Sequence, residues 1–328
     1  MIIMKRLYVI IATLFFVLLC GEEEMSSTNR GDMLYALANQ SVINLRSGPG
    51  HVNELTTQAI MGTPLKIEEK EGTWVRVTTP EGYSGWATLN SIRPMSRREL
   101  DDFIQSKRVI VTTHFTLLRE RPSEHSAIVA DAVWGAVLQY DGDKNRYFKI
   151  ILPNGERAYL YKKHGCDFEK WVRSRKPTAE NIVLTSKEFL GIPYLWGGAS
   201  VKGFDCSGFT KMVYFLNGII IERDASQQAL TGDEIDIKNG LELIQPGDLL
   251  FFGSKATGET DEKVTHVGIY LAAGEFIHSS DRVKINSLIP DTYNYYENAN
   301  KLLKVKRILT RIDKDKSIIS VKKHPWYY

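Results

Sequence analysis

The pattern of hydrophobic and polar residues divides the chain into three parts. An apolar run covers residues 7–19 and follows Lys5 and Arg6. Short segments in which apolar and polar residues alternate fill residues 34–165, and alternation with a period of two predicts β-strands. Apolar residues at helical spacing begin near Ile182, and further strand patterns follow them. This order predicts a targeting segment, an all-β middle and an α+β end.

The first apolar run is too short to cross a bilayer as a helix, which needs about 20 residues. A basic start before such a run is typical of a secretory signal, so we expect an exported protein with a signal peptide over residues 1–20. The run ends at a cysteine, Cys20, in a context similar to a bacterial lipoprotein site. Leu19 departs from the small residue usual before that cysteine, so lipidation of Cys20 and simple cleavage both stay open. We expect a periplasmic protein or an outer-membrane lipoprotein.

The all-β middle contains one pattern twice, at a constant offset of 73 residues. The matching pairs are Leu45 and Leu118, Arg46 and Arg119, Pro49 and Pro122, Gly62 and Gly135, Trp74 and Tyr147, Gly82 and Gly155, and Trp86 and Tyr159. Two copies in one register indicate a duplicated domain rather than a solenoid. We predict two small all-β barrels, over residues 34–95 and 109–165, and we expect most of the aromatic residues to pack in their cores and rims.

One cysteine stands at a position that favours a nucleophile. Cys206 follows Asp205 and begins a helical pattern that ends at Asn217. The first N–H groups of a helix and its peptide dipoles favour a thiolate, so we expect a lowered pKa for this thiol, most strongly beside a cationic histidine. Most free cysteines are buried core residues, and we interpret Cys166 in this way. With Cys20 in the signal, no disulfide framework is expected.

Two histidines fall on a predicted β-hairpin after this helix. The strand patterns cover residues 264–271 and 275–279, and a three-residue loop between them places Gly268 opposite His278. His266 and His278 are then diagonal neighbours on one face, about 7–8 Å apart, within reach of a ring-to-ring hydrogen bond. A two-residue loop would place them on opposite faces, and a chance pair of surface histidines is the alternative interpretation.

Five motifs follow one another within residues 179–310. They are Tyr194-Leu195-Trp196-Gly197-Gly198, Phe204-Asp205-Cys206-Ser207-Gly208-Phe209, Gln245-Pro246-Gly247-Asp248-Leu249, Thr265-His266-Val267-Gly268-Ile269-Tyr270-Leu271 and Phe276-Ile277-His278. Their content and order resemble the NlpC-type papain-like cell-wall cysteine peptidases. The resemblance implies an α+β domain of helices on an antiparallel sheet, with Cys206 as nucleophile, His266 as general base and acid, and His278 orienting His266. It also implies that Tyr194 and the backbone N–H of Cys206 stabilise the oxyanion.

The two predicted barrels resemble bacterial SH3-like domains. The first copy carries Asn44-Leu45-Arg46-Ser47-Gly48-Pro49-Gly50 and Gly85-Trp86-Ala87, and the second is weaker because Glu120-Arg121 replace the Ser-Gly pair. Two such domains before this peptidase are similar to the family's γ-D-glutamyl-L-diamino acid endopeptidases. The resemblance implies that the substrate is a short peptidoglycan stem peptide with a free N-terminal L-Ala.

Five residues are candidates for binding that peptide. Ser207 and Asp224 match positions that hold the free amine in the subgroup, and Asp205 joins them as a neighbour of the nucleophile. Glu54 and Tyr83 are candidates from the first barrel, because a barrel that closed one end of the cleft would have to supply acceptors for a buried ammonium. The alternative interpretations are a helix N-cap for Asp224 and ordinary barrel surface for Glu54 and Tyr83.

Composition and motif order limit the other functions. The 328 residues include 42 basic and 39 acidic ones mixed along the chain, and a net charge of +3 gives no field that indicates nucleic acid. We expect no metal, no cofactor and a monomer that contacts a membrane only through a lipidated N-terminus. The alternatives are an endopeptidase on intact peptidoglycan, a papain-like lipid hydrolase or acyltransferase, and a wall-binding scaffold with an idle catalytic domain. Because Cys206 precedes His266, the peptidase is favoured. Residues 311–328 are predicted as a tail without recognisable chemistry.

Overall fold

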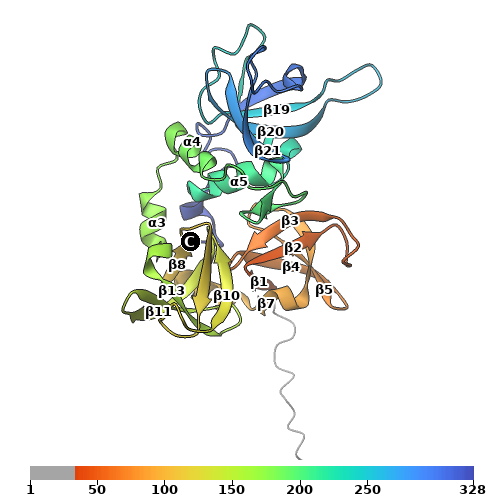
Figure 1. Cartoon of the computed structure of the whole chain (residues 1–328). Helices are drawn as coiled ribbons and strands as arrows, with labels where there is room; N and C mark the ends of the chain where they lie inside the picture. Colours follow the sequence, from red (N-terminus) through yellow and green to blue (C-terminus); the bar gives the residue numbers. More distant parts are fainter. Residues whose placement is uncertain (1–33) are drawn as a thin grey trace, which may run out of the picture. The chain divides into compact units, whose positions relative to one another are not determined.

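The computed structural model describes residues 34–328, which form one unit (Figure 1). The predicted signal peptide and Cys20 lie outside these residues, so the expectations for them stay predictions. In the part that is described, no helix is both long and apolar enough to cross a membrane.

The first barrel is a seven-stranded sheet with the strand order β3-β2-β6-β5-β4-β1-β7. Its strands are β1 (Tyr35–Ala38), β2 (Val42–Arg46), β3 (Leu55–Ile60), β4 (Pro64–Glu71), β5 (Trp74–Thr78), β6 (Ser84–Thr88) and β7 (Ile92–Met95). Alternation sets their orientation: Ile43 and Leu45 of β2 are buried, whereas Asn44 between them is exposed. The period-two pattern in the sequence therefore corresponds to the inside and outside of this barrel.

The second barrel repeats this topology, with the strand order β10-β9-β13-β12-β11-β8-β14. Its strands are β8 (Arg108–Val111), β9 (Phe115–Arg119), β10 (Ile128–Val133), β11 (Val137–Lys144), β12 (Tyr147–Ile151), β13 (Arg157–Tyr161) and β14 (Gly165–Asp167). The strand register also repeats, since Leu45 pairs with Thr57 in the first barrel and Leu118 pairs with Ala130 in the second. The predicted duplication is confirmed, with the same offset in sequence and in structure.

Two helices connect these parts. Helix α2 (Arg97–Gln105) joins the barrels and begins with a capping box, in which Ser96 and Glu99 bond each other's backbone N–H groups. Helix α3 (Phe168–Ser174) follows the second barrel, and its N-cap Asp167 accepts from the backbone N–H of Lys170. Because Phe168 and Trp171 on α3 are buried, this connection is packed rather than a free linker.

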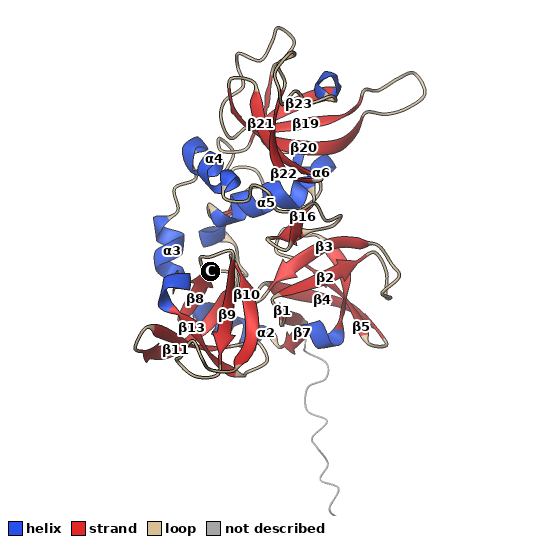
Figure 2. Cartoon of the chain, viewed as in Figure 1, coloured by secondary structure: helices blue, strands red, loops and turns tan. Residues whose placement is uncertain are grey.

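The α+β domain combines three helices with an antiparallel sheet (Figure 2). The helices are α4 (Ala179–Lys187), α5 (Cys206–Leu216) and α6 (Ala225–Gln228). The six-stranded sheet has the order β18-β23-β19-β20-β21-β22, from β18 (Asp233–Ile235), β23 (Leu302–Arg307), β19 (Leu249–Ser254), β20 (Lys263–Ala272), β21 (Glu275–Ser280) and β22 (Arg282–Ser287). Two small ribbons pair β15 (Ala199–Ser200) with β16 (Gly203–Phe204), and β17 (Ile219–Ile220) with β24 (Ile319–Ser320). The predicted fold class is confirmed.

The hairpin β20–β21 has the predicted register but not the predicted loop. Ile269 pairs with Ile277, as expected, whereas Ala272 pairs with Glu275, which leaves a two-residue turn. Both turn residues, Ala273 and Gly274, have positive φ, at 49° and 83°, as a tight hairpin turn requires. The expectation of a three-residue loop was wrong because Leu271 forms a β-bulge that absorbs the third residue.

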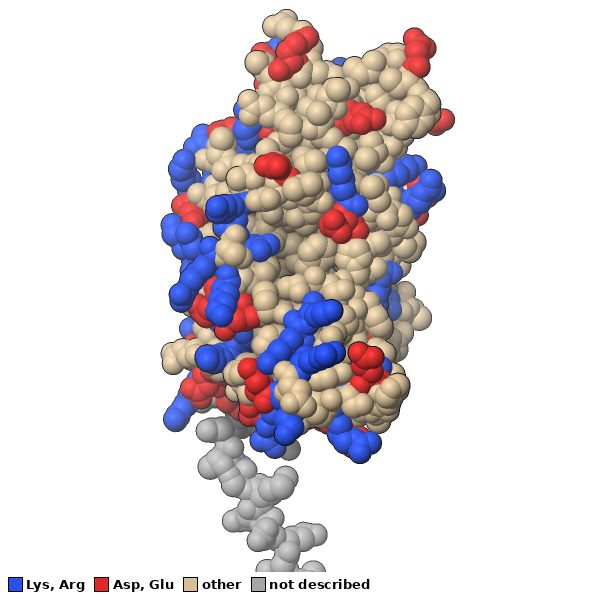
Figure 3. Space-filling view, turned by 60° about the vertical axis from the view of Figure 1, so that its left-hand side comes forward, with Lys and Arg blue, Asp and Glu red and all other residues tan. Residues whose placement is uncertain are grey.

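Charged side chains of both signs are mixed over the face shown in Figure 3. Several form ion pairs between exposed neighbours, such as Arg97 with Asp101 on α2 and Lys149 with Asp141 on adjacent strands. Exposed pairs contribute about 0–1 kcal/mol each. Burial of apolar side chains is therefore the main source of stability.

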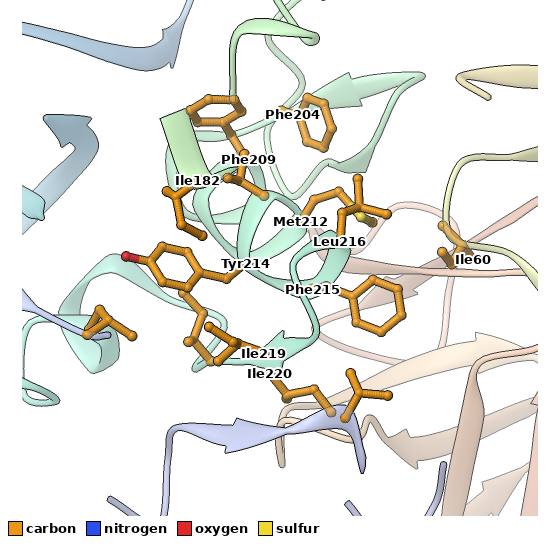
Figure 4. Close-up of a cluster of buried hydrophobic side chains, with 14 of the residues drawn as sticks. Ile60, Ile182, Phe204, Phe209, Met212, Tyr214, Phe215, Leu216, Ile219 and Ile220 are labelled. Atoms are coloured by element: carbon orange, nitrogen blue, oxygen red, sulfur yellow. The ribbon is translucent and has the colours of Figure 1, made fainter. Parts of the chain in front are cut away.

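The largest apolar cluster includes residues of both barrels and of the α+β domain. Helix α5 contributes Phe209, Met212, Phe215 and Leu216, and Figure 4 shows Leu216 and Phe215 on the side of the helix nearer Ile60 of the first barrel. Residues from three sequence domains thus share one hydrophobic core.

Residues 311–328, predicted as a tail, are part of this packing. Ile318, Val321 and Tyr327 are buried, and the Nε2 atom of His324 lies 2.9 Å from the carbonyl oxygen of Pro80 in the first barrel. The Tyr327 carbonyl accepts from Nη2 of Arg108 in the second barrel at 3.0 Å. The C-terminal segment therefore contacts all three domains.

Candidate active site

The start of helix α5 fixes Cys206 in position. Asp205 is the N-cap of this helix, and its Oδ1 accepts from the backbone N–H of Gly208 at 2.6 Å. Its Oδ2 accepts from the backbone N–H of Gly197 at 3.0 Å, which holds the preceding loop against the helix. A Cβ on Gly208 would lie 2.0 Å from the carbonyl oxygen of Gly198, so this close approach needs glycine.

Burial favours the uncharged forms of the thiol and of the imidazoles near it. Burial raises the pKa of the Cys206 thiol to about 11, and the adjacent Asp205 carboxylate acts in the same direction. The expected lowering of this pKa was wrong, because the argument from the helix start left out burial and the charge of Asp205. Burial also holds the pKa values of His266 and His278 well below their usual range. The free site therefore pairs a thiol with a neutral imidazole.

The two histidines form a hydrogen-bonded chain with an asparagine. His266 Nε2 lies 2.6 Å from His278 Nδ1, and His278 Nε2 lies 2.8 Å from Oδ1 of Asn286. The Nδ2 group of Asn286 donates to the carbonyl oxygen of Asn294 at 2.7 Å. This last bond orients the amide, because only its nitrogen can donate to a carbonyl.

The chain determines which ring nitrogens carry protons. Oδ1 of Asn286 accepts from His278 Nε2, so the Nδ1 atom of a neutral His278 is an acceptor. His266 Nε2 must then donate to it, which leaves His266 Nδ1 without a proton. The free lone pair of His266 is thus available to take a proton from a thiol.

Asn286 was not among the residues proposed from the sequence. It lies on β22, where His278 pairs with Lys284 and Phe276 pairs with Asn286. Buried Val283 alternates with Lys284 and Asn286 on this strand, and that alternation is visible in the sequence. Continuing the hairpin by one strand would have placed Asn286 on the same face as His278.

A cavity of about 500 Å³ contains most of the candidate residues. Eight of them line it: Glu54, Tyr83, Tyr194, Asp205, Cys206, Ser207, Asp224 and His266. His278, which is 0 % exposed, is hydrogen-bonded to His266 and does not line the cavity. Residues that are separated by up to 212 positions in the sequence, from 54 to 266, therefore meet in one place.

Two tyrosines present hydroxyl groups that stay protonated. Burial raises the pKa of Tyr83 to about 12, and the carboxylate of Asp224 raises it further. Burial likewise raises the pKa of Tyr194 to about 12, with a further effect of Cys206. Burial also raises the pKa of Asp224, although Arg223 and the Tyr83 hydroxyl oppose this. The cavity thus holds phenol donors near Cys206 and near Asp224.

Asp205, a predicted substrate-binding residue, lines the cavity and has a structural task as well. Its carboxylate accepts five hydrogen bonds: from the N–H groups of Gly197 and Gly208, from two nitrogens of Arg223 and from the hydroxyl of Ser207. A carboxylate has about four lone-pair sites, so this one is fully occupied. Asp205 therefore holds the site together, and its contact with the substrate stays a prediction.

A cysteine at a helix start, beside a histidine pair on an antiparallel sheet, defines the class of papain-like thiol hydrolases. The NlpC/P60 family profile matches residues 191–301, and the bacterial SH3 domain profile matches residues 41–91. A Gamma-D-glutamyl-L-lysine dipeptidyl-peptidase of Bacillus cereus is 34% identical over 257 residues, which cover 75% of this chain and 74% of that one. The chain belongs to the NlpC/P60 family and is a cysteine peptidase.

Further relatives agree with this assignment. A Bacillus subtilis protein with the same name is 32% identical over 75% of this chain and 79% of its own. The crystal structure of an NlpC/P60 family protein from Bacillus cereus superimposes with a TM-score of 0.70 at 27% identity, covering 83% of this chain and 99% of that one. An NlpC/P60 endopeptidase from Photobacterium damselae, at 17% identity and a TM-score of 0.58, shares the fold over 79% of this chain and 67% of its own.

Proposed function

We propose that this protein hydrolyses the bond between γ-D-Glu and an L-diamino acid in short peptidoglycan peptides with a free N-terminal L-Ala. One observation carries the proposal: the cavity that contains Cys206 and His266 also contains Asp224 and, from the first barrel, Glu54 and Tyr83. Acidic and phenolic groups suit an ammonium ion in a partly buried site. The dipeptidyl-peptidase names of two relatives support the same bond and the same end of the peptide.

The reaction follows from the hydrogen-bonded chain. Cys206 Sγ transfers its proton to Nδ1 of His266 and attacks the γ-carbonyl carbon of D-Glu. The oxyanion accepts from the Tyr194 hydroxyl and the Cys206 backbone N–H, and loss of one such donor typically costs about 10²–10³ in kcat. His266 then protonates the leaving amine of the diamino acid, which leaves a thioester on Cys206. Water, deprotonated by His266, hydrolyses the thioester and releases L-Ala-γ-D-Glu.

His278 and Asn286 act through His266 in this scheme. Their hydrogen bonds keep the ring of His266 in one tautomer, with Nδ1 as acceptor. When His266 becomes an imidazolium, its Nε2–H keeps the same neutral partner. We expect His278→Gln to retain partial activity, whereas His266→Ala loses nearly all of it.

In the proposed complex the substrate amine lies between the α+β domain and the first barrel. Asp224 stands at the start of α6, where its backbone N–H donates to Oε1 of Gln227, and its carboxylate lines the cavity. The Ser207 hydroxyl already accepts from Nη1 of Arg223 at 2.9 Å, which fixes its position while a lone pair stays available. In this scheme Asp224 balances the charge of the ammonium, and Ser207, Tyr83 and Glu54 accept its remaining hydrogens.

The test compares L-Ala-γ-D-Glu-L-Lys with its N-acetylated form, for the wild type and for Asp224→Asn. We expect a large preference of the wild type for the free amine, and Asp224→Asn removes most of this preference by lowering kcat/KM for the free peptide alone. Cys206→Ala abolishes hydrolysis of both peptides while the fold is retained. Equal rates of the wild type on the two peptides would refute amine recognition.

The same assay separates the alternative activities. Release of peptides from intact peptidoglycan at a comparable rate would indicate a general endopeptidase, and hydrolysis of a phospholipid would indicate a lipid-directed enzyme. Wall binding without any hydrolysis would indicate a scaffold.

We also infer that the enzyme is exported and acts as a monomer, anchored by lipid on Cys20 or released near it. The apolar run at residues 7–19 supports export, and the sequence around Cys20 supports an anchor. Fractionation of cells that produce wild type or Cys20→Ser tests the anchor. Recovery of both proteins in the soluble periplasmic fraction would exclude lipidation, and light scattering of the purified enzyme tests the monomer.

A further inference from the structure

A buried guanidinium group lies against the start of helix α5. Arg223 stands between β17 and α6, and only 1 % of its surface is exposed. Its Nη2 donates to Oδ2 of Asp205 at 2.5 Å, and its Nη1 donates to Oδ1 at 3.1 Å. This bidentate arrangement is the strongest form of an ion pair with a carboxylate. Arg223 is thus held firmly beside the residue that precedes Cys206.

Two more hydrogen bonds use other donors of the same group. Nη1 also donates to the Ser207 hydroxyl at 2.9 Å, and Nε donates to Oγ1 of Thr57 at 2.7 Å. Thr57 belongs to β3 of the first barrel and is 0 % exposed. Arg223 therefore connects both neighbours of Cys206 to the first barrel through one rigid side chain.

The charge of Asp205 opposes the chemistry proposed for Cys206. As the N-cap of α5 and the acceptor for Gly197, Asp205 is needed as an anion, and this anion raises the pKa of the neighbouring thiol. Arg223 lowers the pKa of the same thiol. A charge within about 4–6 Å shifts a pKa by about 1–3 units, so the loss of this compensation has a measurable effect.

We propose that Arg223 is a positioning residue for the Cys206 thiolate: it neutralises Asp205 and fixes the Asp205–Arg223 pair against Thr57 of the first barrel. The inference rests on the proposed role of Cys206 as nucleophile. Arg223 acts through Asp205 and Ser207, because its guanidinium group donates to these two residues and to Thr57. Helix α5 therefore keeps the Asp205 carboxylate as its N-cap. When the Cys206 thiol ionises, its negative charge lies beside a carboxylate whose charge Arg223 already balances.

The charged and titratable groups around the thiol come from several elements. They are Asp205 and Arg223, His266 on β20, Tyr194 before β15, Asp224 at the start of α6, Glu54 and Tyr83 from the first barrel, Lys263 at the start of β20, and Tyr296 after β22. A titration of the thiol responds to all of these groups. The variants are therefore chosen to change the charges of Asp205 and Arg223 and to keep the charges of the other groups.

The experiment measures the rate at which iodoacetamide alkylates Cys206 as a function of pH, with the modified peptide quantified by mass spectrometry. We expect Arg223→Met to raise the midpoint by about 1 unit or more and to lower kcat/KM at neutral pH by about tenfold or more, mainly in kcat. Arg223→Lys retains the charge, so its midpoint stays close to that of the wild type.

A charge-cancelling pair separates compensation from simple packing. The double variant Arg223→Met with Asp205→Asn removes both charges, and asparagine is a good N-cap. We expect the second substitution to return the midpoint towards the wild-type value. A purely structural role predicts the opposite, because the double variant would be at least as impaired as Arg223→Met.

Arg307 provides a matched control. It ends β23 and forms a bidentate pair with Asp248, which directly precedes β19, with distances of 2.9 Å and 2.8 Å. Arg307→Met removes a comparable ion pair, and we expect it to leave the alkylation midpoint unchanged.

The contact with the barrel is tested by Thr57→Val, which removes the acceptor with little change in shape and should lower kcat severalfold without changing KM.

Each result has a clear meaning. A folded Arg223→Met variant with the wild-type alkylation midpoint overturns the proposal. A Thr57→Val variant with the wild-type kcat overturns the proposed role of the contact with the first barrel. If Arg223→Met does not fold, the single variant Asp205→Asn tests the proposal. It leaves the charge of Arg223 uncompensated and should therefore lower the pH midpoint of Cys206 alkylation. An unchanged or raised midpoint would refute charge compensation by Arg223. Alkylation needs no peptide substrate, so failure of the proposed peptidase specificity would be recognised separately.

Discussion

The two barrels have one topology and different tasks. Their strand orders are equivalent and their pairing registers repeat at the same offset. The first barrel supplies Glu54 and Tyr83 to the cavity and Thr57 to Arg223. The residues 73 positions later are Ala127, Glu156 and Ala130. The scaffold was therefore kept in both copies, and side chains such as Glu54, Tyr83 and Thr57 distinguish the barrel that borders the active site from the barrel that supports it.

The second barrel supports the first one and the α+β domain. The backbone N–H of Val137 donates to the carbonyl of Met61 in the first barrel at 3.1 Å. Trp134 packs on Phe189 near the end of α4, with ring centroids 5.3 Å apart, and His114 stacks on the same ring. The second barrel therefore contributes to function indirectly, because it holds the first barrel and the α+β domain in position.

The largest effect is expected at the contact between the barrels. Gly62 has a φ of +81°, and an added Cβ would lie 1.7 Å from the carbonyl oxygen of Val137. We expect Gly62→Ala to lower the free energy of unfolding by about 3 kcal/mol, from the strained backbone and the overpacked contact together. Urea unfolding measures this value.

Gly82→Ala is the matched control, because Gly82 has the same φ of +81° and open space around it. Gly135 is the equivalent of Gly62 in the second barrel, and its nearest neighbours are side-chain atoms of Ile60 and Phe215 at 3.0 and 3.1 Å. We expect an intermediate loss for Gly135→Ala because side chains can move aside. Equal losses for Gly62→Ala and Gly82→Ala would show that the contact between the barrels contributes nothing.

The next prediction tests whether the second barrel affects stability without affecting catalysis. Trp134→Ala removes a half-buried aromatic contact with Phe189, and we expect a loss of about 2 kcal/mol in the free energy of unfolding. Activity on the free-amine peptide should stay within about twofold of wild type below the unfolding transition. A large fall in kcat/KM of the folded variant would mean that the second barrel takes part in the site more directly.

A smaller effect concerns the wall of the cavity. Tyr83→Phe removes only a hydroxyl, and we expect kcat/KM for the free-amine peptide to fall about tenfold, or about 1.4 kcal/mol, with no change for the N-acetylated peptide. Glu156→Gln at the equivalent position of the second barrel should leave both rates unchanged. If the two substitutions have the same effect, the barrels do not differ in the way proposed.

The smallest effect is in the pH dependence of stability. Burial lowers the pKa of His324, although its bond to Pro80 in the first barrel acts in the opposite direction. The unfolded chain therefore binds more protons than the folded one below about pH 6.5, and stability that is complete above that pH falls as the pH decreases. His266 and His278 act in the same direction.

We expect His324→Gln to flatten this loss slightly when the free energy of unfolding is measured between about pH 5 and 7. His125→Gln, at an exposed position of the second barrel, serves as the control and should leave the slope unchanged. A slope that does not respond to His324→Gln would show that the contact with Pro80 persists when this histidine is charged.

The sequence predicted those features that local pattern determines. Alternation and the repeat gave both barrels, and the motifs around Cys206, His266 and His278 indicated the residues that the cavity brings together. The bulge at Leu271 was not predicted, because a β-bulge and a longer loop give the same spacing of apolar residues.

Tertiary contacts account for the other differences. Asn286 and Arg223 obtain their importance from partners that are distant in the sequence, and each looks like an ordinary polar residue in its own segment. The pKa of the Cys206 thiol depends on burial, which the helix pattern alone does not supply. The packing of residues 311–328 depends on a core that is formed mainly by the rest of the chain.

This C-terminal packing has a consequence for cooperativity. The bond between His324 and Pro80 closes a loop of 244 residues, and Tyr327 shares a cluster with residues of both barrels and the α+β domain. Removing the last few residues would open that cluster at a point where all three domains meet. The domains are separate units along the sequence, but we expect them to unfold as one thermodynamic unit. Exchanging a barrel with that of a relative should then also require exchanging residues 311–328.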